Sequence, residues 1–487
     1  MASICTSNVT SGFIDLATFD ELEKYMYGGG DAVAYFVRDT RKATWFTQVP
    51  VVLSRASGNP AFNTEWSVSI SRAGDYLLSN WLRLTTPEII PNPQVFGDPT
   101  DPATPSANPN LRIRWTRNFM HNIVRECCIT FNDLVAARFD NYHLDFWTAF
   151  TVPAGKRTGY NNMIGNFGDL TDPHAPVASG VSAAATPNGA IPAFTLNLPL
   201  PLFYTRDSGV ALPTAALPYN DMRINFSFRN WTDLLIVDDI SASGTGTNPS
   251  RAAVSNDVVG TPTVNNVQVW ANYAIVSNDE RKRMACAPRD ILIEQVQTAP
   301  RQTFNPANDT TPRFDIRFSH AIKVFFFGAR NTSVSSQWSN YTSGTPAPLA
   351  AEVRYDVVAM SDPILQTSLI YENTNRLSQM GSDYFSLINP WYHAPAIPLE
   401  SGYHMYSYSL DFVCLDPMGS TNYGKLTNVS IVPEASADAI RSATGQFLSS
   451  TVNPTGGDFN QTFEFVTTAV NNNIIRISGG ALGFPVL

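Results

Sequence analysis

Two distant parts of the chain carry the same short motif. Ser71–Ala73 (Ser-Arg-Ala) returns as Ser319–Ala321 (Ser-His-Ala), an offset of 319 − 71 = 248, and an apolar run follows each copy. One match means little, so the test is whether others follow in the same order. Four further pairs do: Gln48-Val49 with Gln295-Val296, Cys128–Asp133 with Ser368–Asn373, Tyr219 with Tyr423, and Ala274 with Ala469.

The offsets of the five pairs change in one direction. Taken along the chain they are 247, 248, 240, 204 and 195 residues, so the extra length belongs to loops of the first half, chiefly around residues 150–200. This ordered set predicts a tandem duplication. A length of 487 residues also suits two domains better than one core.

The repeated segments read as β-strands. Leu111–Trp115, Met222–Phe228 and Val267–Val276 alternate apolar and polar residues, and clusters such as Ser57–Pro60 separate the strands as turns. Long amphipathic helical stretches are missing, which excludes a βαβ architecture. We therefore expect an all-β fold of two tandem eight-stranded antiparallel jelly-roll β-sandwiches (a double jelly roll), with long loops and a short N-terminal helical arm.

The expected loops are unusually long. Residues 85–110 hold seven prolines in the 23 positions from Pro87 to Pro109, and proline stiffens a loop before folding. Loops of this length usually carry function or disorder, and here they would project from the ends of the sandwiches. The other segments of this kind are 171–197, 241–264, 331–350 and 434–460.

The charge composition limits the possible partners. Charged residues make up only 15% of the chain, against a usual share of about 25%, which suggests that much of the surface is covered by partners. The net charge is −9, and the densest basic cluster, residues 279–283, contains two acids. Direct nucleic-acid binding needs Lys and Arg to displace counterions from phosphates, so we do not expect it.

The five cysteines and the apolar runs indicate a reducing, soluble compartment. The cysteines have no CxxC spacing and their number is odd, which does not fit a disulfide framework. Cys127 and Cys128 are expected to point to opposite faces of one strand as packing residues. No apolar run approaches 18 residues, and the N-terminus lacks a basic region followed by a hydrophobic one.

An arm precedes the first repeated strand. Thr18 and Glu21 form a capping-box pattern, which predicts a helix over residues 19–27 after an extended Ser11–Leu16, with Gly28 as the left-handed C-cap. Phe19, Leu22 and Met26 would share one face of that helix. The helix could fold onto its own domain or dock on neighbours or accessory proteins. An acidic polar face disfavours membrane insertion.

No catalytic, cofactor or metal site is expected. Gly28–Gly30 lacks the Lys-Ser/Thr of a phosphate loop, Gly155–Thr158 lacks the upstream glycine spacing, and the six histidines show no metal-binding spacing. Asp133 and Glu372 occupy equivalent strand ends in two separate sandwiches, whereas a glycosidase needs both carboxylates at one bond. We expect both in turns, and we do not expect an enzyme.

The sequence resembles one family from end to end, the iridovirus major capsid proteins, nearest to the invertebrate iridescent virus type. The segments that carry the resemblance are SGFIDLATFDELEKYMYGG, GNPAF, SRAGDYLL, RWTRNFMHNIV, KRTGYNNMIGN, RDSGVALPTAALPYNDMRI, RFSHAIK, LIYENTNRL, GSTNYGKLTN and NNNIIRISGGALGFP. The resemblance implies two jelly rolls in one chain and a homotrimer that forms a pseudo-hexagonal capsomer. It further implies an icosahedral virion shell, assembled in the host cytoplasm over an internal lipid membrane that the protein does not span.

The resemblance also implies domain limits and partners. The arm would be 1–30, the first jelly roll 31–278, a charged connector 279–290 and the second jelly roll 291–487. Minor capsid proteins would lie on the inner side with the arm, and the residues expected to anchor that contact are Phe13, Ile14, Phe19, Leu22 and Met26. The competing class is a monomeric carbohydrate-binding or carbohydrate-cleaving sandwich protein, which a measurement of mass would separate from a trimer.

Overall fold

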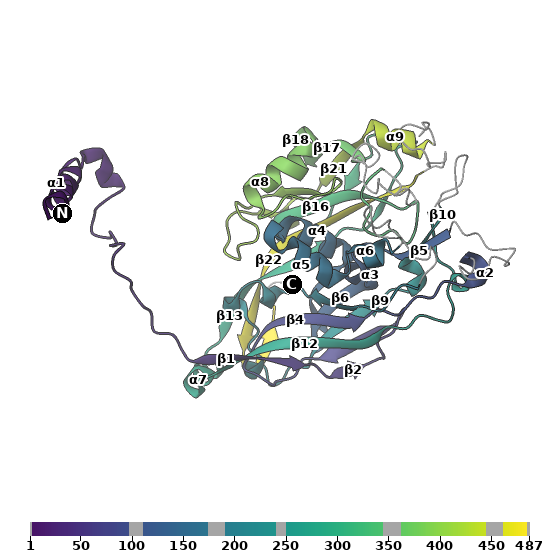
Figure 1. Cartoon of the computed structure of the whole chain (residues 1–487), viewed down its shortest axis with the longest axis horizontal. Helices are drawn as coiled ribbons and strands as arrows, with labels where there is room; N and C mark the ends of the chain where they lie inside the picture. Colours follow the sequence, from purple (N-terminus) through teal and green to yellow (C-terminus); the bar gives the residue numbers. More distant parts are fainter. Residues whose placement is uncertain are drawn as a thin grey trace. The chain divides into compact units, whose positions relative to one another are not determined.

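The computed structural model describes residues 2–96, 111–173, 190–239, 250–343, 362–444 and 461–484. The chain divides into two compact units, Met1–Trp45 and Phe46–Leu487. The first unit is an arm, and the second contains the β-sheets labelled in Figure 1.

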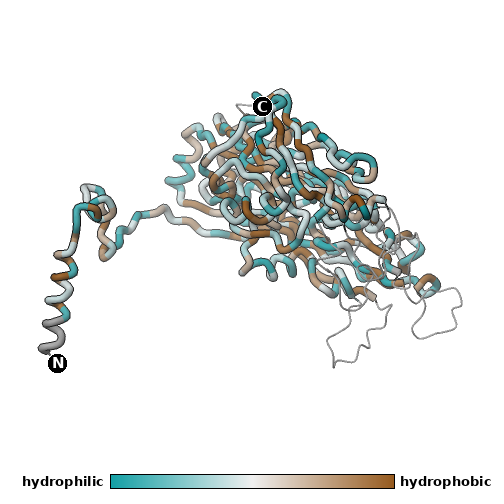
Figure 2. Tube along the Cα trace, turned by 90° about the horizontal axis from the view of Figure 1, so that it is seen from above, coloured by the Kyte–Doolittle hydropathy of each residue, from teal (hydrophilic) through white to brown (hydrophobic). Residues whose placement is uncertain are grey.

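The helix of the arm spans different residues from those that the sequence predicted. Helix α1 (Ala2–Ala17) comes first, and only a single 3₁₀ turn, η1 (Glu21–Tyr25), follows it. The predicted extended segment Ser11–Leu16 and the predicted helix over residues 19–27 are therefore wrong. Apolar residues recur along this unit (Figure 2).

Local hydrogen bonds explain where the helix ends. The Thr18 hydroxyl donates to the carbonyl of Asp15 at 2.7 Å, so Thr18 closes α1 and does not cap a later helix. Asp20 caps the 3₁₀ turn, because its carboxylate accepts the N–H of Glu21 at 2.6 Å. Gly28 has a φ of +113°, a backbone conformation that favours glycine.

The second unit begins with two main sheets, which we call the first roll. One is four-stranded and the other five-stranded, and all their pairings are antiparallel. In spatial order the strands are β1 (Phe46–Val52), β12 (Asn265–Val276), β4 (Tyr76–Thr85) and β8 (Thr195–Pro199); and β2 (Arg55–Ser57), β3 (Glu65–Ser69), β9 (Met222–Phe228), β6 (Val124–Phe131) and β7 (Leu134–Asp140). A small sheet of β11 (Ser250–Ala252), β10 (Leu235–Asp239) and β5 (Leu111–Trp115) accompanies them.

The rest of the second unit contains two further sheets, the second roll. The larger has the path β13 (Arg289–Thr298), β22 (Phe463–Ser478), β16 (Ala321–Asn331) and β19 (His404–Ser407), with β14 (Gln302–Phe304), β20 (Thr421–Asn422) and β23 (Ala481–Gly483) attached. The other has the order β15 (Phe314–Asp315), β21 (Val429–Ala435), β17 (Ile364–Tyr371) and β18 (Thr374–Gly381).

The two rolls repeat one strand order. β1-β12-β4-β8 corresponds to β13-β22-β16-β19, and β3-β9-β6-β7 corresponds to β15-β21-β17-β18. In each roll the chain passes between the two sheets in the same sequence, as in a jelly roll.

The motif pairs occupy corresponding places in the two rolls. Ser71–Ala73 leads from β3 into β4, and Ser319–Ala321 leads from β15 into β16. The turns after β6 and β17 both have two residues at positive φ, namely Asn132 (49°) and Asp133 (65°), and Glu372 (45°) and Asn373 (65°). Two consecutive left-handed residues make the type I′ turn that matches the twist of a hairpin.

One pair of matches is displaced by a small shift in register. Gln48 of the first roll pairs with Ala274. Its counterpart Gln295 pairs with Asn471, while Ala469 pairs with Gln297. A shift of two residues keeps every side chain on the same face of the sheet, so the duplication preserves the core.

Helices fill the connections. The described ones in the second unit are α2 (Pro93–Phe96), α3 (Phe119–Ile123), α4 (Asn141–Thr151), α5 (Ala154–Ile164), α6 (Gly168–Thr171), α7 (Asn278–Cys286), the π-helical turn η7 (Tyr384–Ile388), α8 (Asn389–His393) and α9 (Ala437–Ala443). Short 3₁₀ turns are η2 (Phe203–Thr205), η3 (Ser208–Val210), η4 (Thr214–Ala216), η5 (Trp231–Asp233), η6 (Ser255–Asp257) and η8 (Tyr423–Lys425). The added length between β7 and β8 is thus partly helical, not only loop.

Large parts of the predicted loops cannot be compared with the structure. Residues 97–110, 174–189, 241–249, 344–350 and 445–460 of the predicted loops lie outside the described residues. Within the segment 434–460, the described part includes α9.

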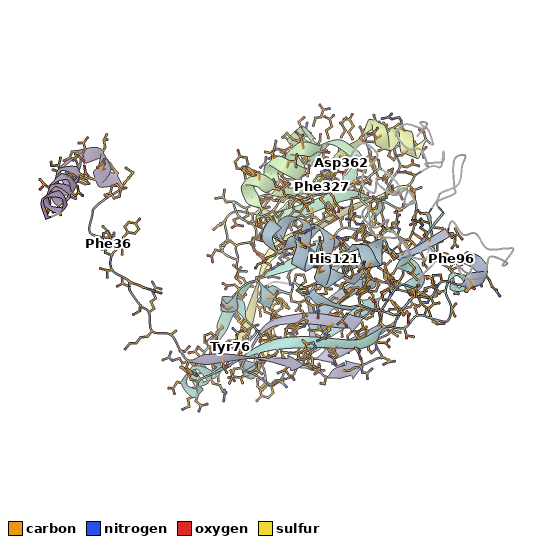
Figure 3. The ribbon with its side chains drawn as sticks, in the orientation of Figure 1. Phe36, Tyr76, Phe96, His121, Phe327 and Asp362 are labelled. Atoms are coloured by element: carbon orange, nitrogen blue, oxygen red, sulfur yellow. The ribbon has the colours of Figure 1, made fainter. Side chains whose placement is uncertain are left out.

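Within the described residues, three buried apolar clusters form the core. One fills the first roll and one the second roll, where Phe327 lies (Figure 3). The third joins α4 of the first roll to the outer face of β16, β19 and β22 in the second roll. The cysteine expectation is confirmed, since Cys127 is buried in the first core and Cys128 faces the other side, near Asn225.

Candidate functional site at the junction of the two rolls

Helix α4 of the first roll lies against the large sheet of the second roll (Figure 1). Asp140 caps the helix, because its carboxylate accepts the N–H of His143 at 3.0 Å. Ten of its eleven residues, Asn141 to Phe150, are buried. The helix is therefore positioned by packing on all sides and not by one apolar stripe.

Aromatic rings form the centre of the junction. Phe326 of β16 lies between two rings of α4: the Phe146 centroid is 6.2 Å away and the Phe150 centroid 5.5 Å away, both stacked. Trp147 meets Phe412 edge-on at 5.6 Å. Such aromatic pairs add about 0.5–1.5 kcal/mol each beyond their buried area, so the junction holds the two rolls firmly together.

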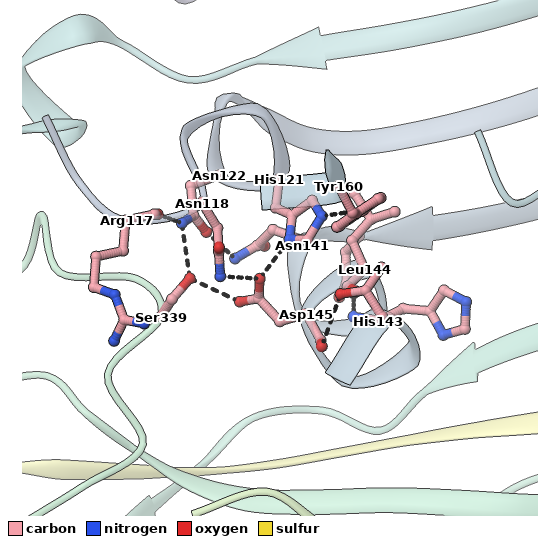
Figure 4. Close-up of polar contacts among 12 residues, drawn as sticks. Arg117, Asn118, His121, Asn122, Asn141, His143, Leu144, Asp145, Tyr160 and Ser339 are labelled. Carbon is pink, nitrogen blue, oxygen red and sulfur yellow. Dashed lines mark hydrogen bonds and ion pairs between the residues drawn. The ribbon is translucent and has the colours of Figure 1, made fainter. Parts of the chain in front are cut away.

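Asp145 of α4 collects polar contacts from both rolls (Figure 4). Its carboxylate accepts from the hydroxyl of Ser339 at 2.9 Å and from that of Tyr341 at 3.2 Å, both in the second roll. On the other side the Nδ1 of His121 lies 2.8 Å away, and Asn118 donates at 3.3 Å. A buried carboxylate with four partners is well satisfied, so Asp145 fixes the position of α4.

The His121 ring continues this network into the first roll. Its Nε2 lies 2.6 Å from the hydroxyl of Tyr160 on α5. Burial raises the pKa of Tyr160, so its hydroxyl keeps its proton. This geometry suits a His121 ring that accepts at Nε2 from Tyr160 and donates from Nδ1 to Asp145.

A second buried cluster centres on Glu294 of β13. The Lys323 ammonium lies 2.5 Å from one carboxylate oxygen and donates to the carbonyl of Cys414 at 2.7 Å. Arg206 of the first roll approaches the other oxygen at 3.2 Å, and its guanidinium lies 3.8 Å from the centre of the Trp147 ring. Burial lowers the pKa of Arg206. Removing one member of such a cluster leaves a buried charge without compensation.

Burial and the neighbouring Arg206 together determine the protonation state of His143. This fully buried histidine has a pKa lowered to about 3, first by burial and then by the nearby charge of Arg206. His143 is therefore neutral at physiological pH. Its ring packs near Phe139 and Trp147 as an aromatic side chain.

Trp338 is held between two arginines, one from each roll. The guanidinium of Arg229 lies 3.5 Å from the ring centre and that of Arg330 lies 4.0 Å from it. The indole N–H donates to the carbonyl of Asp233 in the first roll at 2.8 Å. Burial lowers the pKa of Arg229 to about 10, so the group stays charged at neutral pH. Cation–π contacts that are shielded from water are worth about 2 kcal/mol each.

These clusters are structural and not catalytic. The Ser339 hydroxyl donates to Asp145, and the junction's histidine and carboxylate are almost fully buried, with side-chain exposures of 1% and 0%. Among the described residues, no group of three or more His, Cys, Asp or Glu could hold a metal ion. In the same part of the chain, no helix is both long enough and apolar enough to cross a membrane.

Asp133 and Glu372 lie in the turns where we expected them. Each stands in the type I′ turn of a different roll. The Glu372 carboxylate accepts the Thr427 hydroxyl at 2.6 Å and the N–H groups of Asn428 and Thr427 at 3.1 and 2.7 Å, and these bonds lower its pKa. Glu372 therefore stabilises the turn in which it lies.

The predicted arm residues lie in two separate elements. Phe13 and Ile14 belong to α1, whereas Phe19, Leu22 and Met26 lie in and around η1. All five residues are exposed, by 68, 62, 46, 76 and 74% of their surface respectively. The structure therefore leaves them uncovered but does not gather them on a single helical face.

Sequence comparison identifies two matching family descriptions, one for each roll. Residues 34–276 match "Major capsid protein N-terminus", and residues 280–483 match "Large eukaryotic DNA virus major capsid protein". The chain is 60% identical over 485 residues to the major capsid protein of Costelytra zealandica iridescent virus, with both chains covered completely. It is 59% identical to that of Invertebrate iridescent virus 6 and 47% identical to that of Lymphocystis disease virus 1, again with complete coverage of both chains.

Solved structures share the fold at low sequence identity. The capsid of the virus PBCV-1, described by a quasi-atomic model, has a chain that superposes with a TM-score of 0.68 at 17% identity, over 93% of this chain and 100% of that one. The Faustovirus major capsid protein superposes with a TM-score of 0.66 at 12% identity, over 95% of each chain.

Proposed function

Since this chain belongs to the iridovirus major capsid proteins, and so assembles with itself into the virion shell, we propose that three copies close into a pseudo-hexagonal capsomer. The protein is structural and not an enzyme. In the proposed capsomer, three chains contribute six similar rolls around one threefold axis. Such a block tiles an icosahedral face using only trimeric closure.

One observation carries this proposal: the two rolls repeat one strand order and are held together by a buried junction. A sixfold-like tile requires that the two rolls of each chain be similar in shape and fixed relative to each other. The sheet orders supply the similarity, and the aromatic and polar contacts of α4 supply the fixed relation.

We further infer the extent of each roll. Each would be an eight-stranded jelly roll, built from β1, β3, β4, β6, β7, β8, β9 and β12 and from β13, β15, β16, β17, β18, β19, β21 and β22. The domain limits 31–278, 279–290 and 291–487 remain our proposal. It is supported by the two family matches, which meet between residues 276 and 280, and by α7, which lies between β12 and β13.

The N-terminal part of the arm, residues 1–30, is proposed to bind minor capsid proteins on the inner side of the shell. The support is the exposure of Phe13, Ile14, Phe19, Leu22 and Met26, since exposed apolar side chains gain free energy when a partner covers them. An internal membrane would lie nearby without being spanned. The net charge of −9 suits a shell that lipid separates from nucleic acid during assembly in the host cytoplasm.

Measuring the mass of the purified chain tests the proposal. A trimer has three times the 53.4 kDa of the chain, about 160 kDa, and should appear as pseudo-hexagonal blocks by electron microscopy. A 53.4 kDa monomer at all concentrations, without such blocks, would contradict the proposed capsomer.

A further inference from the structure

Inside the chain, one roll already shows how a helical segment docks on the sheet of the other. The docking segment is α4, which lies between β7 and β8 of the first roll. It packs on one end of a row of directly paired residues that crosses the large sheet of the second roll. Met405 of β19 and Phe326 of β16 lie in one apolar cluster with α4, and the row continues through Thr468 of β22 to the exposed Thr298 of β13. Directly paired residues of antiparallel strands point to one face, so this row forms a single strip.

The first roll has an equivalent row on its own four-stranded sheet. It consists of Pro199 of β8, Trp81 of β4, Trp270 of β12 and Val52 of β1, again directly paired. Every member is either apolar or aromatic, so the strip is more hydrophobic than the one on which α4 packs.

A shared irregularity establishes the equivalence. The pairing of β4 with β12 shifts immediately after Leu77, and that of β16 with β22 shifts immediately after Ile322. Both of these residues are completely buried in their own roll. Trp81 is four residues beyond Leu77, as Phe326 is four residues beyond Ile322. Trp81 therefore stands where Phe326 meets α4.

The row in the first roll points away from its core and is only partly covered. Trp81 and Trp270 stack with parallel rings, 6.0 Å between centroids, and both remain half-buried. Val52 is 42% exposed. The neighbouring Leu82 on β4 points the other way, into the core of the roll.

The second roll carries an exposed counterpart of α4. The segment between β18 and β19 consists of η7 and α8, the position that α4 holds between β7 and β8. Phe385 and Pro390 anchor it to its own roll. Its outward apolar residues are exposed by 50, 45, 72 and 74%: Leu387, Ile388, Trp391 and Tyr392.

We propose that the η7–α8 segment of one copy docks on the Val52–Trp270–Trp81–Pro199 row of a second copy, as α4 docks on the Phe326 row within the chain. Trp391 and Tyr392 would pack on this row as the aromatic residues of α4 pack on Phe326. The inference rests on the proposed trimer and assigns the surfaces that close it.

The position of the two surfaces explains why the occupant is a second copy. The docking segment is on the second roll and the receiving row is on the first, so the contact is heterologous, head to tail. A heterologous contact closes into a ring when the rotation allows it, and each of three chains then offers one of each surface. The same type of contact would alternate within and between chains around the capsomer.

Mass measurement by light scattering tests the docking segment. We expect the full chain to be a trimer of about 160 kDa and Trp391→Asp/Tyr392→Asp to fall to the 53.4 kDa monomer. Leu365→Asp is the matched control, because Leu365 is also an exposed apolar residue (54%) but lies on β17, in the other sheet. It should stay trimeric.

The outcomes separate the two proposals. If the unaltered chain is monomeric, the proposed capsomer fails. If the chain is trimeric and Trp391→Asp/Tyr392→Asp is trimeric too, the capsomer stands and the docking inference is wrong. Should the Asp variant lose its circular dichroism spectrum, Trp391→Ala/Tyr392→Ala replaces it, and an unchanged trimer dissociation constant for that variant overturns the inference.

The receiving row has its own test. Trp81→Ala/Trp270→Ala removes two outward-facing rings from the first roll and should raise the concentration at half-dissociation about tenfold or more. A trimer with unchanged dissociation would show that the row takes no part.

Discussion

The carboxylate of Asp145 accepts a 2.9 Å hydrogen bond from the hydroxyl of Ser339, a residue 194 positions further along the chain and in the other roll. The same carboxylate also accepts from Tyr341 and lies 2.8 Å from the His121 ring. One side chain thus links α4, its own roll and the second roll. The effect of removing it measures how strongly the two rolls depend on each other.

Asp145→Ala should strongly destabilise the chain. It leaves buried donors on Ser339, Tyr341 and His121 without their acceptor, and the loss should be about 3 kcal/mol or more of unfolding free energy. Urea denaturation followed by circular dichroism gives the value. Asp221→Ala, at an exposed ion pair with Arg223, should stay within about 0.5 kcal/mol. Equal losses in the two variants would contradict the role of the junction.

His143 should make the unfolding free energy depend on pH. Its pKa is about 3 in the folded chain and near 6.5 when unfolded, so between these values the unfolded chain binds one more proton. Its contribution is fully present above pH 6.5 and decreases as the pH falls, by about 1.4 kcal/mol per unit. In His143→Phe the slope of unfolding free energy against pH should be smaller by that amount in this window.

Gly402→Ala should disrupt the second roll next to the junction. Gly402 has a φ of +97°, and a Cβ there would lie against the carbonyl oxygen of Tyr341 and 2.8 Å from the Tyr341 Cβ. The expected loss exceeds about 3 kcal/mol, because conformational strain and a backbone clash add. Gly260→Ala is the control: φ is +80° but no atom lies within 4 Å, so only the strain of about 1 kcal/mol applies. Thermal melting of both variants measures the difference.

Deleting residues 1–27 should leave the trimer intact and prevent normal shells from forming. A finer variant changes Phe13, Ile14, Phe19, Leu22 and Met26 to Ser and keeps the charges of the arm. Its control neutralises Asp15, Asp20 and Glu23. Light scattering measures the trimer, and electron microscopy of particles from expressing cells measures assembly. Normal particles from the deletion would rule out the proposed inner contact.

The duplication was readable from the sequence because alternation and turn residues are local signals. Ser71–Ala73 and Ser319–Ala321 occupy equivalent entries into β4 and β16, and the two type I′ turns need residues that tolerate positive φ. These features depend on a few neighbouring residues each, so an ordered search finds them. The fold class followed from them.

Helix α4 was invisible for a physical reason. Asn141 to Phe150 are buried on every side, so the helix has no polar face and no 3.6-residue pattern to detect. The arm helix was misplaced because Thr18 fits a capping box but in fact closes the preceding helix. The Asp145 network joins residues that are distant in sequence, and no local pattern contains that information.

The arginine clamp on Trp338 has a mechanical consequence. With Arg229 and Arg330 gripping one indole from opposite rolls, the protomer has no hinge at this point. A shell built of such rigid chains bends only at the contacts between chains. In the proposed icosahedral shell, the curvature at edges and corners would then be taken up at the contacts between separate chains, which can change their angle without deforming the chains themselves.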